Sequence, residues 1–157
     1  MTSTIVTNRN ISQLGALRRL SSGSSATAAS TGDATSVTGV TVDRMGFGIP
    51  SMPMSLALGI VYETNLATSK TLSIGYAVQD SADGSNWSDY QTATYAVVAT
   101  GSTASSALTG QLEVAVDLSS ARRYVRANYQ PDLSATQTDT ASFRAVGFFA
   151  GFDRIPA

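Results

Sequence analysis

The residues with the most potential for chemistry lie in one short stretch, AVQDSADGSNWSDY, at positions 77–90. It holds three aspartates (Asp80, Asp83 and Asp89), an Asp-Gly pair, and Trp87, the only tryptophan of the chain. Clustered carboxylates are ligands that Ca²⁺ prefers, and a tryptophan beside several aspartates is a common composition of sugar sites. The third interpretation is a tight turn between two strands, because Gly84 accepts positive φ without steric cost.

An EF-hand loop does not fit this stretch. Aligning Gly84 with the loop's glycine puts Tyr90 where the bidentate carboxylate of the last position is needed. A looser metal site made of Asp80, Asp83 and Asp89 stays open as an alternative, and so does a sugar site on Trp87. The hairpin interpretation is favoured, since Asp83-Gly84 follows an alternating run. In this interpretation Asp83, Gly84 and Trp87 form the turn, and Trp87 covers the edge of the core.

Residues for catalysis are scarce. The chain has no histidine and no cysteine, which removes the commonest general base and any thiolate chemistry. Lys70 is the only lysine, and Ala67 stands where a Ser-x-x-Lys motif would need serine. Glu63 and Glu113 are the only glutamates, and no spacing singles out a carboxylate pair. We therefore expect no enzyme, no catalytic residues, no cofactor and no bound metal.

Composition restricts the partners. The 157 residues suit one domain, with a net charge of −1 and only 13% charged residues. A nucleic-acid surface needs dense lysine and arginine, so no nucleic-acid partner is expected. No apolar run reaches membrane-spanning length and no signal-peptide core is visible, so no membrane partner is expected either. Nine arginines against one lysine favour side chains that make specific contacts.

The first 33 residues differ from the rest. Apolar residues Ile11, Leu14, Leu17 and Leu20 recur every third position, which predicts a short helix over residues 10–20. The tract SSGSSATAASTGD, residues 21–33, has the composition of a flexible linker. We expect residues 1–33 to be a flexible arm that binds a partner, and the domain to remain folded without it. The candidate interface residues are Arg9, Ile11, Leu14, Leu17, Arg18, Arg19 and Leu20.

From Val37 onward the apolar pattern has period two. Runs such as SLALGIVY, TLSIGYAV and QLEVAVDL alternate apolar and polar residues and are bounded by turn residues. This predicts an all-β domain over residues 34–157, a jelly-roll-like antiparallel β-sandwich preceded by an extended N-terminal arm. A short turn is expected over Asp117–Arg122. The predicted core is Leu56, Leu58, Ile60, Leu72, Ile74, Val78, Leu112, Val114, Val116, Val125 and Phe143.

The order of phrases along residues 37–155 resembles the capsid decoration (cement) proteins of tailed bacteriophages. QDSADGSNWSDY is similar to their strand, S-x-D-G-x-x-W, strand hairpin, and RRYVRANYQPDLS is similar to the R-Y-V-R strand that follows it. The resemblance implies a jelly-roll-like sandwich on the outer capsid surface of the virion, bound to the major capsid protein and to other copies of itself, often as a trimer. It implies no particular binding residue.

Two other classes of function remain open from the sequence. A carbohydrate-binding sandwich module shares the D-G-S-x-W phrase, and a phage tail-tube or tail-terminator subunit shares the β-rich composition. The decoration protein is the favoured interpretation, because a neutral domain joined to an adhesive extension suits a cement.

Overall fold

The computed structural model describes residues 14–47, 52–102, 106–134 and 138–152, and within them it contains nine strands and no helix. None of the described residues forms a helix of the length and apolarity that crossing a membrane requires. The strands are β1 (Gly15–Arg19), β2 (Ser24–Thr27), β3 (Val42–Asp43), β4 (Ser55–Leu66), β5 (Thr71–Ser81), β6 (Ser88–Thr100), β7 (Ser106–Asp117), β8 (Tyr124–Leu133) and β9 (Thr140–Ala150).

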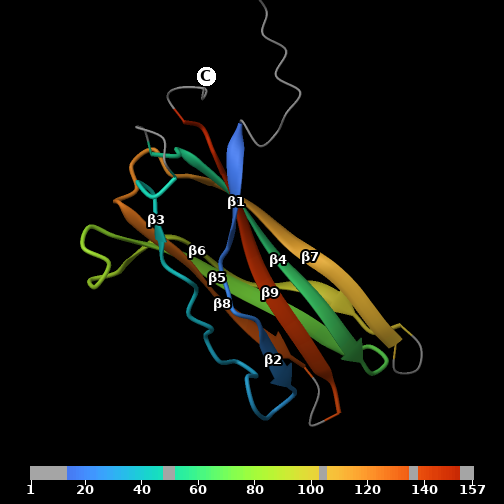
Figure 1. The fold of residues 1–157 in the computed structure, drawn as a ribbon. Helices are drawn as coiled ribbons and strands as arrows, with labels where there is room; N and C mark the ends of the chain where they lie inside the picture. The colour runs from blue at the N-terminus through green and yellow to red at the C-terminus, as the bar shows by residue number, and fades with distance from the viewer. Residues whose placement is uncertain (1–13, 48–51, 103–105, 135–137, 153–157) are drawn as a thin grey trace, which may run out of the picture.

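The strands form two layered antiparallel sheets (Figure 1). One sheet has the order β1-β9-β4-β7, with β2 also paired to β9, and the other has the order β3-β8-β5-β6. Both β1 and β2 pair with β9, one after the other along its length, so together they act as one interrupted edge strand. Two four-stranded sheets in these orders are the jelly roll, whose connections pass repeatedly from one sheet to the other. The predicted fold is therefore confirmed.

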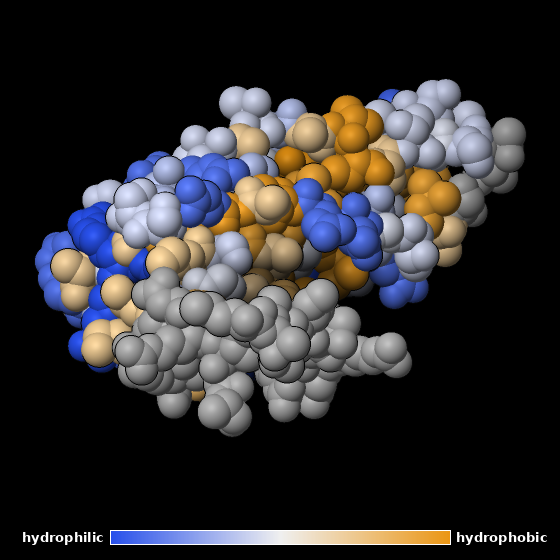
Figure 2. Space-filling view, turned by 90° about the horizontal axis from the view of Figure 1, so that it is seen from above, coloured by the Kyte–Doolittle hydropathy of each residue, from blue (hydrophilic) through white to orange (hydrophobic). Residues whose placement is uncertain are grey.

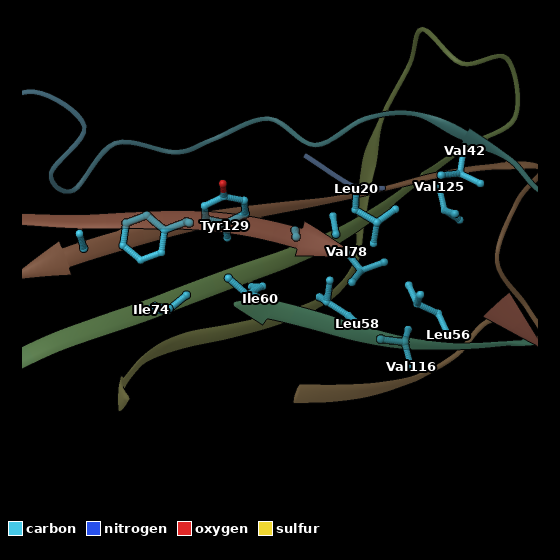
Figure 3. Close-up of a cluster of buried hydrophobic side chains, with 14 of the residues drawn as sticks. Leu20, Val42, Leu56, Leu58, Ile60, Ile74, Val78, Val116, Val125 and Tyr129 are labelled. Atoms are coloured by element: carbon cyan, nitrogen blue, oxygen red, sulfur yellow. The ribbon is translucent and has the colours of Figure 1, made fainter. Parts of the chain in front are cut away.

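The core fills the space between the layers, and the period-two pattern places its residues correctly. Leu56, Leu58 and Ile60 of β4 point toward Ile74 and Val78 of β5 (Figure 3). Every residue of the predicted core is buried except Leu112 and Val114, which are half-buried against it. Both lie on β7, an edge strand of the sheet, where one side of the core is open.

The predicted helix over residues 10–20 is wrong for the part that the structure describes. Gly15–Arg19 forms strand β1, antiparallel to β9, with Leu17 opposite Phe148. Sheet pairing explains the difference, because the outer edge of β9 offers a row of backbone partners that a helix would leave unpaired. Leu20 then turns into the core and is only 1% exposed, while its N–H donates to the Ala145 carbonyl at 2.8 Å.

Residues 21–33 also differ from the expected flexible linker. They contain β2, in which Ala26 pairs with Ala141 of β9, and the Ala26 side chain is buried. Asp33 fixes the end of the stretch, since its carboxylate accepts hydrogen bonds from the backbone N–H groups of Ala29 and Leu133 at 2.6 and 2.8 Å. Serine and alanine suit this position because small side chains pack closely against β9. Residues 1–13 lie outside the described residues, and the arm expected there stays a prediction.

Arg44 is a buried charge that the sequence did not predict. Its guanidinium is 2% exposed and donates hydrogen bonds to the carbonyls of Pro53, Leu118, Ala121 and Arg122. Burial lowers the pKa of Arg44, but a guanidinium stays charged at any physiological pH. The expected turn at residues 117–122 is present, with the Asp117 carboxylate accepting from the Ser119 N–H at 2.9 Å. Arg44 therefore ties this turn to the segment before β4.

We predict that the edge strand is required for stability. Deleting residues 1–13 should leave the free energy of unfolding nearly unchanged, whereas deleting residues 1–33 should lower it by at least about 3 kcal/mol. The second deletion removes Leu20, whose loss alone is in the range of about 2–5 kcal/mol for a buried leucine, and uncovers β9. Urea unfolding followed by fluorescence of Trp87 measures both. Equal stability of the two truncated proteins would contradict this role of β1 and β2.

Candidate protein-docking face

The stretch of residues 77–90 is a hairpin between β5 and β6, as the sequence predicts. Gly84 has φ of +75°. Asp83 organises the loop, because one carboxylate oxygen accepts from the N–H groups of Ser85 and Asn86 at 2.9 and 2.8 Å. These backbone hydrogen bonds hold the pKa of Asp83 well below its usual range. The loop is held together by hydrogen bonds among its own polar groups.

The three aspartates of this stretch do not converge. Asp80 is buried and forms an ion pair with Arg122. Asp83 accepts hydrogen bonds from backbone N–H groups of its own loop. Asp89 accepts a hydrogen bond from the Gln79 side-chain amide at 2.7 Å. In the described parts of the chain, no three His, Cys, Asp or Glu side chains are grouped so that they could hold a metal ion. The looser metal site of the sequence has no geometric support in this hairpin.

Trp87 lies elsewhere than expected. The sequence suggested that it covers the edge of the core, but the Arg126 guanidinium stacks on its ring, 4.2 Å from the centroid. Arg126 Nε in turn donates to the side-chain amide oxygen (Oε1) of Gln79 at 2.8 Å on the outer face of the four-stranded sheet. Trp87 therefore holds the hairpin against that face through a cation–π contact.

The predicted interface residues separate into distinct groups. Arg9 and Ile11 lie outside the described residues. Leu20 is part of the core and is not available to a partner. Leu14 and Leu17 remain at the surface, 43% and 65% exposed. Arg19 is exposed as well, while the Arg18 guanidinium lies 4.5 Å from the ring centroid of Phe47.

Leu17 belongs to an apolar surface that the sequence did not reveal. Strand register puts Leu17 beside Phe148, Phe148 beside Ala57, and Ala57 beside Ala115. All four point away from the core, because their neighbours along each strand, such as Leu56 and Phe149, are buried. Val146 and Val61 continue the surface along β9 and β4. We call this surface the docking face; its residues are Leu17, Ala57, Val61, Ala115, Val146 and Phe148.

The docking face is hollowed at its centre. Gly59 lies there, beside Val146 on β9 and Glu113 on β7, and a side chain at this position would meet only Val146 at ordinary contact distance. Leu17 and Phe148 form one wall of the hollow. Seen from the top of Figure 1, the molecule has hydrophobic residues in the middle of the view and hydrophilic ones at its left end (Figure 2). A contiguous exposed apolar surface with a polar surround marks a site of protein contact.

No protein-family model matches the chain, and no characterised protein matches it in sequence. Solved structures with a similar fold include infectious bursal disease virus Gx strain, at 11% identity and a TM-score of 0.45, covering 90% of this chain and 34% of that one. A second is the PBSX exported protein XepA, at 13% identity and a TM-score of 0.45, covering 90% of this chain and 39% of that one. A third is dimeric latent PorU from Porphyromonas gingivalis, at 11% identity and a TM-score of 0.47, covering 89% of this chain and 13% of that one. This chain spans at most 39% of each of these three. At these identities and TM-scores the likeness decides nothing about function.

We predict a pH dependence of stability from Asp80. Hydrogen bonds from the Arg122 guanidinium, the shortest at 2.5 Å, lower the pKa of Asp80 below its usual value. The carboxylate therefore stabilises the fold above the unfolded-state pKa of about 3.9, and this contribution is lost as the pH falls through the lower folded-state pKa. Asp80→Asn should lower the melting temperature at pH 7, and the difference from wild type should shrink below pH 4.

Thermal unfolding between pH 2 and pH 7 measures this dependence. Asp132→Asn is the matched control, because Asp132 takes part in no ion pair among the described residues. A constant difference between wild type and Asp80→Asn at every pH would show that the Asp80 charge does not stabilise the fold.

Proposed function

We propose that the protein is a structural subunit of a phage particle, a decoration protein on the outer surface of the head shell. It would stabilise the shell through contacts with the major capsid protein and with other copies of itself. The observation that carries the proposal is the docking face, where Leu17 is 65% exposed on a strand of a two-sheet sandwich. A block with a preformed apolar surface suits an assembly in which many weak contacts act together.

The motifs behind the resemblance to decoration proteins have structural roles here, which supports the proposal. QDSADGSNWSDY forms the β5–β6 hairpin, and RRYVRANYQ leads into and forms most of β8, the neighbour of β5. Such motifs specify the sandwich and leave its faces free for contacts that differ between particles. Fold alone does not specify function, so the proposal depends on the docking face.

The proposal assigns no catalytic role to Glu63 and Glu113, the two glutamates of the chain. Glu63 and Glu113 share the outer face of the sheet, but Glu113 pairs with Gly59, four residues before Glu63 on β4. At about 3.3 Å per residue their Cα atoms are separated by roughly 13 Å along the strand direction. Glycoside cleavage needs two carboxyl groups within about 5–9.5 Å.

We predict that the docking face is needed for binding to the head. Leu17→Asp should reduce occupancy on undecorated capsids of the encoding phage at least tenfold, because a buried charge cannot be accommodated in an apolar contact. Val97→Asp is the matched control, since Val97 is 61% exposed on β6 of the other sheet. Sedimentation of capsids mixed with each protein gives the occupancy. Absence of wild-type binding, or equal loss by both variants, would contradict the proposal.

Carbohydrate binding is a second candidate, with a different location. A groove on the outer face of the four-stranded sheet is lined by Gly75, Gln79, Tyr95, Asn128 and Gln130, and the Tyr95 side chain lies over Gly75. Amide groups around an exposed aromatic ring suit recognition of sugar hydroxyls. If this candidate holds, a glycan array should show binding that Tyr95→Ala removes and Leu17→Asp leaves intact. No binding of the wild-type protein to any glycan would eliminate it.

A further inference from the structure

The docking face is complementary to itself. We propose that it binds the same face of a second copy, about a two-fold axis that runs parallel to the strands and passes between β9 and β4. The inference names a partner for the face on which the proposed function rests. The register of β1, β9, β4 and β7 fixes which residues such an axis brings together.

The axis exchanges the strands in pairs. In the order β1-β9-β4-β7, β1 comes to lie over β7 of the partner subunit and β9 over its β4. Residues in one register row therefore face each other across the contact. Sheets that pack face to face keep their strands within about 30° of parallel and about 10 Å apart, so this correspondence holds along the row.

Large side chains then meet small ones. Phe148 faces the partner's Ala57, because both pair in one row. Leu17 faces the partner's Ala115 in the same row. In the next row Val146 faces the partner's Gly59, the residue at the centre of the hollow. Interdigitation of this kind is what allows two surfaces to pack as densely as a protein interior.

Opposite charges also meet. Arg19 and Glu113 occupy one row, since Arg19 pairs with Val146, Val146 with Gly59, and Gly59 with Glu113. Three strand spacings separate them by roughly 14 Å in one chain, and neither makes an ion pair within the described residues. Across the axis Arg19 faces the partner's Glu113. Two-fold symmetry repeats this pair, so two ion pairs flank the apolar contact.

The alternative two-fold axis, running across the strands, lacks this complementarity. It places β1 over β1 of the partner subunit and β7 over its β7. Depending on where the axis crosses the rows, Arg19 would then face the partner's Arg19, the partner's Leu17 or the partner's Gly15. In the last case Glu113 would face the partner's Asp117. Like charges oppose association, and an arginine that faces an apolar residue lacks the carboxylate that Arg19 meets across the other axis. The pairing of Arg19 with Glu113 therefore favours the axis parallel to the strands.

The size of the face sets the strength of the contact. Four strands about 4.8 Å apart and three rows about 6.7 Å apart cover roughly 20 × 20 Å. That is about 400 Å² per copy, below the ~800 Å² per partner of standard stable interfaces. We therefore expect a weak dimer in solution. Copies held close together on a shell would saturate such a contact.

Charge reversal tests the inference with the full-length protein. Sedimentation equilibrium from micromolar to millimolar concentration should show a monomer–dimer equilibrium for wild type. Arg19→Glu and Glu113→Arg should each weaken dimerisation at least tenfold, because each creates two like-charge contacts. An equimolar mixture of the two variants should form a heterodimer, since both ion pairs are then restored, one with its native sign and one with reversed sign. The double variant R19E/E113R should also dimerise, within about threefold of wild type.

The matched control is Lys70→Glu, the same charge change at an exposed lysine outside the docking face; it should dimerise like wild type. Thermal melting checks that each variant is folded. A wild-type protein that stays monomeric at millimolar concentration overturns the inference. So does a trimer, or dimerisation that does not respond to Arg19→Glu. A monomer that still decorates capsids would refute only this inference, and a dimer that never binds capsids would refute only the proposed function.

Discussion

The outer edge of β9 is the constraint on which much of this structure depends. A strand edge left uncovered exposes a row of unpaired N–H and C=O groups. Here β1 and β2 cover that edge, and Leu20 enters the core where the chain passes from one to the other. Gly147 makes the entry possible, because a Cβ there would lie 2.7 Å from methyl carbons of Leu20 and Leu56. The same pairing places Leu17 beside Phe148, so covering the edge adds Leu17 to the docking face.

The charged residues divide between holding the fold together and facing solvent. Arg44, Arg122 and Arg123 meet at the segment between β7 and β8, where Arg122 pairs with Asp80 and Arg123 with Asp43. The abundance of arginine, which in the sequence favoured contacts with partners, is thus partly explained by contacts within the chain. Arg19 and Arg144 are different, because they are exposed on the outer face of the five-stranded sheet without an ion pair among the described residues.

The two outer faces of the sandwich have different chemistry although both are solvent-facing. On the four-stranded sheet, Gln79 accepts hydrogen bonds from Arg126 and Asn128 and donates one to Asp89, which gives a polar surface whose groups satisfy one another. On the other sheet the row from Leu17 through Phe148 and Ala57 to Ala115 is small or apolar. Burying this row in a contact therefore costs little desolvation, whereas burying the first face would break existing hydrogen bonds.

The sequence by itself determined the sandwich, its core and its hairpin. Period-two alternation is a local property, so it identified β4, β5 and the inward positions such as Leu58, and Asp83-Gly84 identified the turn. The hairpin implied a strand after Trp87, but no alternating run marked β6, because most of its residues are exposed. Only the tertiary structure showed that residues 14–27 form edge strands of the sheet. Spacing of three suggested a helix, but in a strand it turns Leu17 outward and Leu20 inward, and pairing with a strand more than a hundred residues away made that the stable choice. The docking face was hidden for the same reason: its rows join side chains from four strands, and only register brings them side by side.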